Sequence, residues 1–180
     1  MRGHLSPTNL GSPRADGETE TMHFRHLASV LIGISVLFPV FGFLQTRRIR
    51  ASYNIQEVTV ASKKATLMND WRLADNCKDS DDTVILVRKS APEKWISVSY
   101  KGGLVYTVVG DQIRSSSGTV VKDMDAIAVH QILGIPSGPL QGGELPGDLY
   151  EIRNVVGQVV LRIGVEYNKG RAERYSIQLE

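Results

Sequence analysis

An acidic stretch offers the first group of side chains that could bind a ligand. Residues 75–82 read DNCKDSDD, which places oxygen-bearing side chains at alternate positions, as a calcium-binding loop does. Ser80 occupies the position that needs glycine, and Leu86 the position of the bidentate glutamate. We therefore interpret the stretch as a solvated turn between a helix and a strand, and we predict no metal site.

Candidate catalytic residues are sparse. His130 is the one histidine beyond His26, so a serine–histidine–carboxylate triad would have to include it, but no nucleophile elbow accompanies it. Cys77 lacks a CxxC partner and is a poor candidate nucleophile. The Gly-Gly pairs at 102–103 and 142–143 lack the strand and helix context of a phosphate-binding loop, so we interpret them as turns. We predict no catalytic or cofactor-binding residues, and a protein that is not an enzyme.

Two tryptophans could anchor a partner. Trp71 and Trp95 each carry a large apolar surface with one polar group, a combination that is common at interfaces. Packing in the core is the commoner fate of such side chains, so both interpretations stay open.

Composition limits the class of protein. The 180 residues carry 21 basic and 19 acidic side chains, and the basic ones form no stripe, so a nucleic-acid partner is not expected. A single cysteine excludes an intrachain disulfide. This length suits one domain with an appendage, which must be stabilised by packing.

The N-terminal part divides into a polar leader and an apolar span. Residues 1–22 are rich in Gly, Pro, Ser and Thr and are expected to be disordered. Within residues 23–45, positions 27–44 form an uncharged run that, as a helix, would extend about 27 Å, enough to cross a bilayer. We predict a transmembrane helix; a cleaved signal peptide and a buried core helix are the alternatives.

A second helix is expected to continue the first. Residues 46–76 contain no Gly or Pro, and apolar residues recur at three- and four-residue steps, which indicates a helix. This stripe consists of Ala51, Ile55, Val58, Ala61, Ala65 and Met68. The β-branched stretch 55–60 could instead be a strand, but its apolar positions do not alternate. We predict one rod, half in lipid and half amphipathic.

Residues 77–180 are expected to form a small antiparallel β domain. Runs of β-branched and aromatic residues are separated by turn residues. Two hairpins are predicted, one turning at 101–103 and the other at 168–170. Residues 124–133 are ambiguous, with a slight preference for a strand, and 134–147 form a long surface loop. The strands are expected at 83–88, 94–100, 104–109, 119–122, 155–166 and 174–179.

A family resemblance accompanies the apolar run. Residues 26–37, HLASVLIGISVL, resemble the N-terminal helix of type IV pilin-like proteins. Phe24, Arg25 and Ser29 stand where that family has its cleavage-site glycine, first mature phenylalanine and glutamate, so the prepilin motif is degenerate. The hairpin sequence 98–106, VSYKGGLVY, is similar to one in J-type minor pseudopilins of type II secretion. The resemblance implies an α+β, pilin-like fold, in which the long N-terminal helix precedes the β domain.

Two functions follow from these features. The resemblance implies a structural subunit of a type II secretion or type IV pilus-like assembly, whose N-terminal helix contacts other pseudopilin or pilin-like subunits and inner-membrane lipid. The alternative is a single-span membrane protein whose β domain binds a ligand or partner through the loop 134–147. We expect a single-pass inner-membrane protein with an extracytoplasmic β domain, although positive-inside counting of Arg47, Arg48 and Arg50 by itself favours the cytoplasm.

Overall fold

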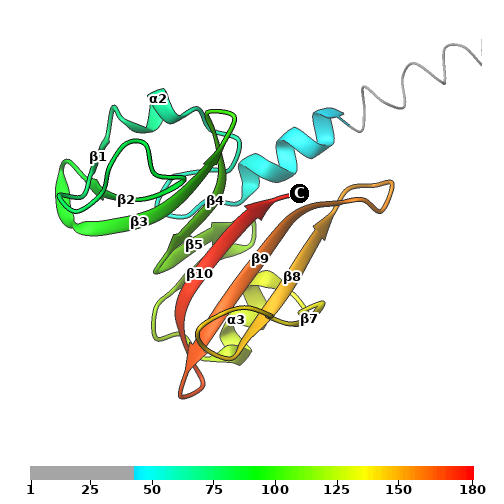
Figure 1. Cartoon of the computed structure of the whole chain (residues 1–180). Helices are drawn as coiled ribbons and strands as arrows, with labels where there is room; N and C mark the ends of the chain where they lie inside the picture. The colour runs from blue at the N-terminus through cyan, green and yellow to red at the C-terminus, as the bar shows by residue number, and fades with distance from the viewer. Residues whose placement is uncertain (1–42) are drawn as a thin grey trace, which may run out of the picture. The chain divides into compact units, whose positions relative to one another are not determined.

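An antiparallel sheet dominates the computed structural model, which describes residues 43–180. These residues belong to one compact unit, 41–180. The sheet is 8-stranded, with order β1-β2-β3-β4-β10-β9-β8-β7, so the last strand lies at its centre (Figure 1). Its strands are β1 Trp71–Leu73, β2 Thr83–Arg88, β3 Ala91–Lys101, β4 Leu104–Gly110, β7 Gly138–Pro139, β8 Gly147–Arg153, β9 Val159–Asn168 and β10 Arg171–Leu179.

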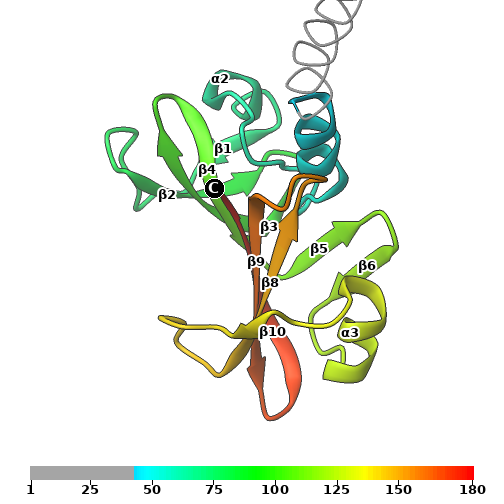
Figure 2. The same cartoon turned by 90° about the vertical axis from the view of Figure 1, so that its right-hand side faces the viewer.

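Smaller elements pack on one face of this sheet. They are a separate hairpin of β5 Gln112–Ser115 and β6 Gly118–Val121, the helix α3 Ala126–Leu133, and the irregular segment 53–62. The short helix α2 Lys64–Leu67 follows that segment (Figure 2). The expected leader, 1–22, and nearly all of the expected transmembrane helix, 23–45, lie outside the described residues.

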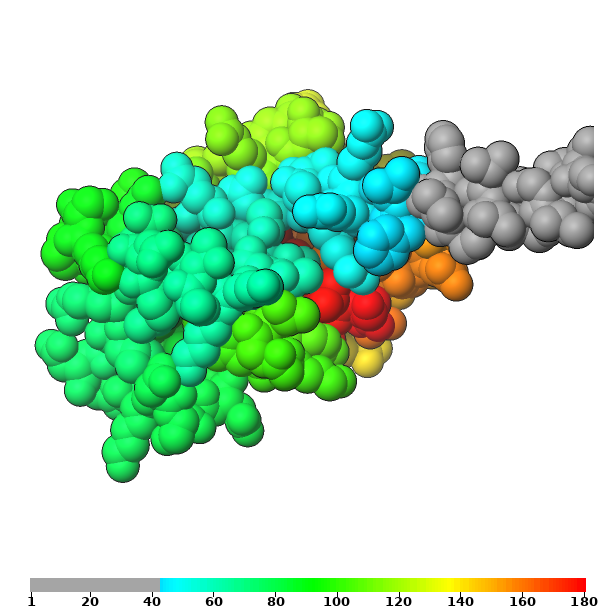
Figure 3. Space-filling view, turned by 90° about the horizontal axis from the view of Figure 1, so that it is seen from above, coloured from blue at the N-terminus to red at the C-terminus, as the bar shows by residue number. Residues whose placement is uncertain are grey.

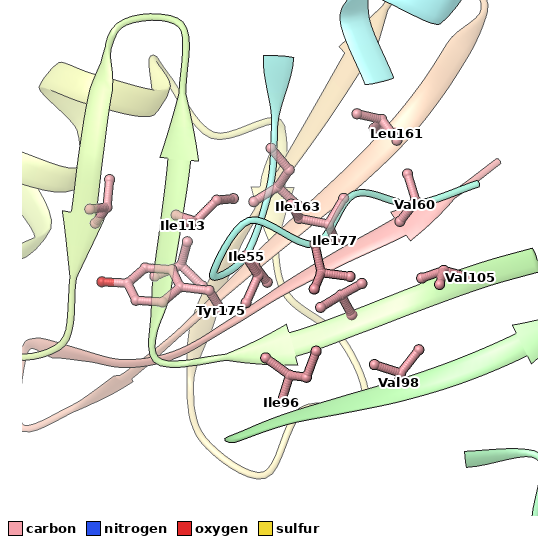
Figure 4. Packing of buried hydrophobic residues seen from close by; sticks show 14 of the residues in the cluster. Ile55, Val60, Ile96, Val98, Val105, Ile113, Leu161, Ile163, Tyr175 and Ile177 are labelled. Carbon is pink, nitrogen blue, oxygen red and sulfur yellow. The ribbon is translucent and has the colours of Figure 1, made fainter. Parts of the chain in front are cut away.

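The two faces of the sheet differ in chemistry. On the covered face, one cross-strand row runs Tyr150, Ile163, Ile177, Val108, Val98 and Val84, and all six are buried. Ile55 and Val60 of the irregular segment pack among Leu161, Ile163 and Ile177 (Figure 4). On the other face, the adjacent row mixes three apolar side chains with a glycine and two serines, and it runs Leu149, Gly164, Ser176, Val109, Ser97 and Ile85. We call this second side the open face.

The predicted rod is wrong, and with it the pilin-like fold class. The first described helical segment ends at Ser52, and residues 53–76 form an irregular segment, α2 and β1 with their connecting turns instead of the rest of an amphipathic helix. The apolar stripe is nevertheless partly buried, since Ile55 and Val58 lie in the core. What is missing is the helix that was expected to present them. Within residues 43–180, no helix has both the length and the hydropathy that a bilayer span requires.

A tight turn explains why the helix does not continue. Ile55 and Val58 exchange both backbone hydrogen bonds, at 3.0 and 2.9 Å, around Gln56 and Glu57. These two central residues have φ of 48° and 71°, as in hairpin turns that usually contain Asn-Gly. The turn packs closely against Gly110 of β4, where a Cβ atom would lie only 2.6 Å from Ile55 Cγ2. Tertiary packing thus overrides the helical spacing.

The β-domain predictions are partly confirmed. Both predicted hairpins exist, β3–β4 with positive φ at Gly102 and Gly103, and β9–β10 with positive φ at Lys169 and Gly170. Residues 124–133, for which a strand was slightly preferred, contain the helix α3. Asp125 caps this helix, since its Oδ1 accepts a hydrogen bond from Ala128 N at 2.9 Å.

Candidate binding site

A groove on the open face of the sheet is the first candidate site. It lies between the segment 138–141 and the strands β8, β9 and β10, and its volume is about 510 Å³. It is lined by Gly138, Pro139, Leu140, Gln141, Leu149, Glu151, Arg162, Gly164, Ser176 and Gln178. One wall is therefore part of the loop 134–147 that the sequence nominates as a contact surface.

Glycines in β8 and β9 bring this loop close to the sheet. A Cβ on Gly164 would lie 2.6 Å from Ser176 Oγ and 3.0 Å from Leu140 Cδ1, so the Leu140 side chain occupies space that any other residue would fill. A Cβ on Gly147 would lie 2.2 Å from the backbone oxygen of Val165. Leu140 N also donates to Gly147 O at 2.8 Å. The wall of the groove is therefore held by packing and by backbone hydrogen bonds.

Paired charges surround the polar floor. Arg162 lies between Glu180, at 2.9 Å, and Glu151, at 3.6 Å. Arg153 pairs with the same Glu151. Ser176 and Gln178 provide neutral hydrogen-bonding groups from β10. The groove therefore combines apolar wall residues with a positive side chain, a negative side chain and two neutral hydrogen-bonding groups.

The two tryptophans have different environments. Trp71 is 4% exposed and belongs to the core, whereas Trp95 is 41% exposed. Trp95 pairs in register with Val87, and the odd-numbered residues Trp95 and Ser97 project to the open face. Of the two candidate anchors, only Trp95 is available to a partner.

His130 lies in a polar cluster on the covered side of the sheet. Its Nε2 is 2.8 Å from Asp148 Oδ2, and the Tyr167 hydroxyl donates to the same oxygen at 2.9 Å. Within residues 43–180, no serine, threonine or cysteine hydrogen-bonds to this ring. The geometry therefore fits a histidine that fixes α3 to β8, without an attached nucleophile.

Burial perturbs the tyrosines beside this cluster. The Tyr150 ring meets His130 edge-on, and burial, with a smaller contribution from the Asp148 carboxylate, raises the pKa of Tyr150 to about 12. Burial, together with the hydrogen bond to Asp148, also raises the pKa of Tyr167. Both phenols therefore stay protonated at neutral pH. The Tyr167 hydroxyl donates its proton to the hydrogen bond with Asp148.

The acidic stretch forms a turn. Asp81 Oδ2 accepts a hydrogen bond from Lys78 N at 3.0 Å, and Asp79 pairs with Lys64 at 2.7 Å. Cys77 is half-buried, and its sulfur accepts from Ile85 N at 3.3 Å. The described part of the chain contains no group of three or more metal-ligating side chains.

Comparisons of the chain with protein-family models, with curated proteins and with solved structures find no match. The groove and the other contacts described above are therefore the basis for any functional assignment.

The groove was only partly foreseeable from the sequence. The sequence indicated the loop 134–147, which forms one wall of the groove. It did not predict the strand β8, which supplies Leu149 and Glu151, because the Pro146-Gly147 pair at its start is typical of a loop. The available signal was Gly164, a lone glycine in an apolar strand, since such a residue often marks the close approach of another segment.

Proposed function

We propose that the protein is a membrane-anchored, non-catalytic binding protein. Its β domain would hold a short polypeptide segment of a partner in the groove formed by segment 138–141 and strands β8 to β10. The observation that carries the proposal is the loop held over Gly164, which creates a defined groove on the otherwise uncovered face of the sheet. The anchor in the proposal is the uncharged run 27–44 of the sequence.

A polypeptide is favoured by the chemistry of the lining. Ser176 and Gln178 offer hydrogen bonds to an amide backbone, and Glu151 and Arg162 offer opposite charges to side chains. Leu140 and Leu149 supply apolar contacts at the wall. Beyond the groove, the open face extends to the exposed Trp95, which suits the aromatic anchor of a larger interface.

The role as a pseudopilin-like structural subunit stays a prediction. Its sequence support is the resemblance of residues 26–37, but its architectural support was a continuous rod. Since the helical segment 43–52 does not continue beyond Ser52, the geometry favours the binding protein over the assembly subunit. Recovery of pilin-like subunits bound to the full chain in mild detergent would favour the assembly role.

Selection from a peptide-display library on the full chain in mild detergent tests the groove. Peptides that bind should share a motif and should lose at least tenfold in affinity for the variant Ser176→Tyr, whose ring fills the groove from its floor. Ser117→Tyr, in the exposed turn between β5 and β6, is the matched control and should bind as the wild type does. Peptides that bind the Ser176 variant unchanged would place the interface elsewhere.

A further inference from the structure

Four exposed apolar side chains gather where the described chain begins. Phe43 is 70% exposed and Leu44 53%, and in the β8–β9 loop, residues 154–158, Val155 is 69% and Val156 56% exposed. The helical segment 43–52 and this loop lie side by side (Figure 3). Solvent exposure of four large apolar residues from two separate segments indicates a surface that contacts something.

A hydrogen bond joins the two segments. Gln45 Oε1 accepts a hydrogen bond from Val155 N at 3.1 Å, although the residues are 110 positions apart. A hollow of about 420 Å³ beside them is lined by Leu44, Gln45, Arg48 and Val155. Leu44, Gln45 and Arg48 of the helical segment therefore face the loop at Val155, while Phe43 projects from a neighbouring side of the same helical turn.

The loop is ordered by its own contacts. Asn154 Oδ1 accepts from both Val156 N and Gln158 N, at 3.1 and 3.0 Å. Arg153 Nη1 donates to Gly157 O at 2.7 Å. The two valines are thus presented outward by a preformed turn, so that binding through them would cost little conformational entropy.

The helical segment contributes positive charge to this patch. The helical segment 43–52 carries Arg47, Arg48 and Arg50 and no acidic residue, and both Arg47 and Arg48 are exposed. An apolar patch with neighbouring arginines is the combination by which peripheral segments bind an anionic lipid surface.

We propose that Phe43, Leu44, Val155 and Val156 form one interfacial contact that inserts into an anionic bilayer surface, with Arg47 and Arg48 at its phosphate groups. This inference rests on the anchoring in the proposed function, because the uncharged run 27–44 ends at this patch and so brings it to the lipid surface. The loop provides a second contact with the membrane, which restrains the β domain relative to the lipid surface.

Site-specific labelling of the full chain tests this contact. In a Cys77→Ser background, V156C carries an environment-sensitive fluorophore, and K169C, at the opposite end of β9, is the matched control. The protein is reconstituted in vesicles of equal parts phosphatidylcholine and phosphatidylglycerol that contain a headgroup-proximal quencher lipid. The label at 156 should be quenched several-fold more than the label at 169. The difference should shrink when Arg47 and Arg48 are replaced by Gln, and in vesicles of phosphatidylcholine alone.

The other outcomes are distinct. If the chain floats with vesicles but the two labels are quenched equally, the interfacial contact is overturned and the anchor stands. If the label at 156 instead becomes less accessible to solvent in detergent as the protein concentration rises, a second copy covers the patch. That result also overturns the proposal. A chain that does not float with vesicles overturns both the anchor and the contact.

Discussion

The side chain of Leu140 lies over Gly164, so that the loop after β7 rests on the backbone of β9. This contact joins the wall of the groove to its floor. It also explains a glycine in the middle of a strand, a position where glycine by itself weakens the sheet.

Replacing Gly164 by Ala should displace the loop. The new methyl group would meet Leu140 Cδ1 at 3.0 Å and Ser176 Oγ at 2.6 Å, and overpacking of this kind costs about 1–3 kcal/mol. Denaturant unfolding of the full chain in mild detergent, followed by tryptophan fluorescence, measures the loss. Gly138→Ala, where a Cβ meets nothing within 4 Å, should change the free energy of unfolding little. Equal stability of the two variants would contradict the close contact.

Replacing Asp125 by Ala should destabilise α3. The Asp125 carboxylate accepts the Ala128 N–H at the start of the helix, and loss of such a cap costs about 0.5–2 kcal/mol. Asp125→Asn keeps an acceptor oxygen and should remain within a few tenths of a kcal/mol of the wild type. If both variants lose the same stability in the unfolding assay, the charge of Asp125 matters more than its role as a cap.

Stability should fall at alkaline pH. Tyr150 has a pKa of about 12 in the folded chain and 10.0 as its ordinary value, so between these values the unfolded chain releases a proton that the folded chain keeps. The stabilisation is complete below pH 10 and is lost as the pH rises through the folded-state value, with a slope of up to about 1.4 kcal/mol per pH unit. Burial also raises the pKa of Tyr175, which adds to the effect.

Tyr150→Phe isolates one contribution to this alkaline loss. The Tyr150 hydroxyl has no hydrogen-bond partner among residues 43–180, so its removal should cost little stability at neutral pH. Between pH 10 and 12, the free energy of unfolding of this variant should then fall less steeply with pH than that of the wild type. An unchanged slope would show that the Tyr150 phenol titrates normally.

Membrane orientation can be predicted from charge. The extracytoplasmic position expected above followed from the pilin-like architecture, which the structure contradicts. The remaining argument is the asymmetry of basic residues, since Arg47, Arg48 and Arg50 follow the uncharged run, and this favours a cytoplasmic β domain. Reporters fused after Glu180 should therefore be active in the cytoplasm; activity limited to the other side would restore the earlier expectation.

Local sequence signals predicted the two hairpins, but they failed where tertiary packing determines the backbone conformation. Alternation together with Gly102-Gly103 was enough for β3–β4, because the turn residues and the pattern agree. Gln56 and Glu57 carry no such signal, since neither is a residue that usually adopts positive φ. The turn forms because Ile55 and Val58 gain burial in the core. Spacing in the sequence cannot reveal that gain.

The helix α3 and the groove illustrate the same limit. Ile127, Val129 and Gln131 alternate as in a strand, whereas the informative residue was Asp125, an N-cap that precedes the apolar stretch. For the groove, the loop 134–147 was identified, but its position over Gly164 depends on strand order. That order places the C-terminal strand between β4 and β9, which no local pattern predicts.

The central position of β10 has a consequence for biosynthesis. Residues 171–179 leave the ribosome after every other strand of the sheet, yet the two halves of the sheet, β1 to β4 and β7 to β9, are joined through them. The sheet therefore cannot close until β10 has been synthesised, and until then the nascent chain carries unpaired strand edges. Nascent chains of this protein should depend on chaperones during that interval, and premature stop codons within β10 should send the product to proteolysis.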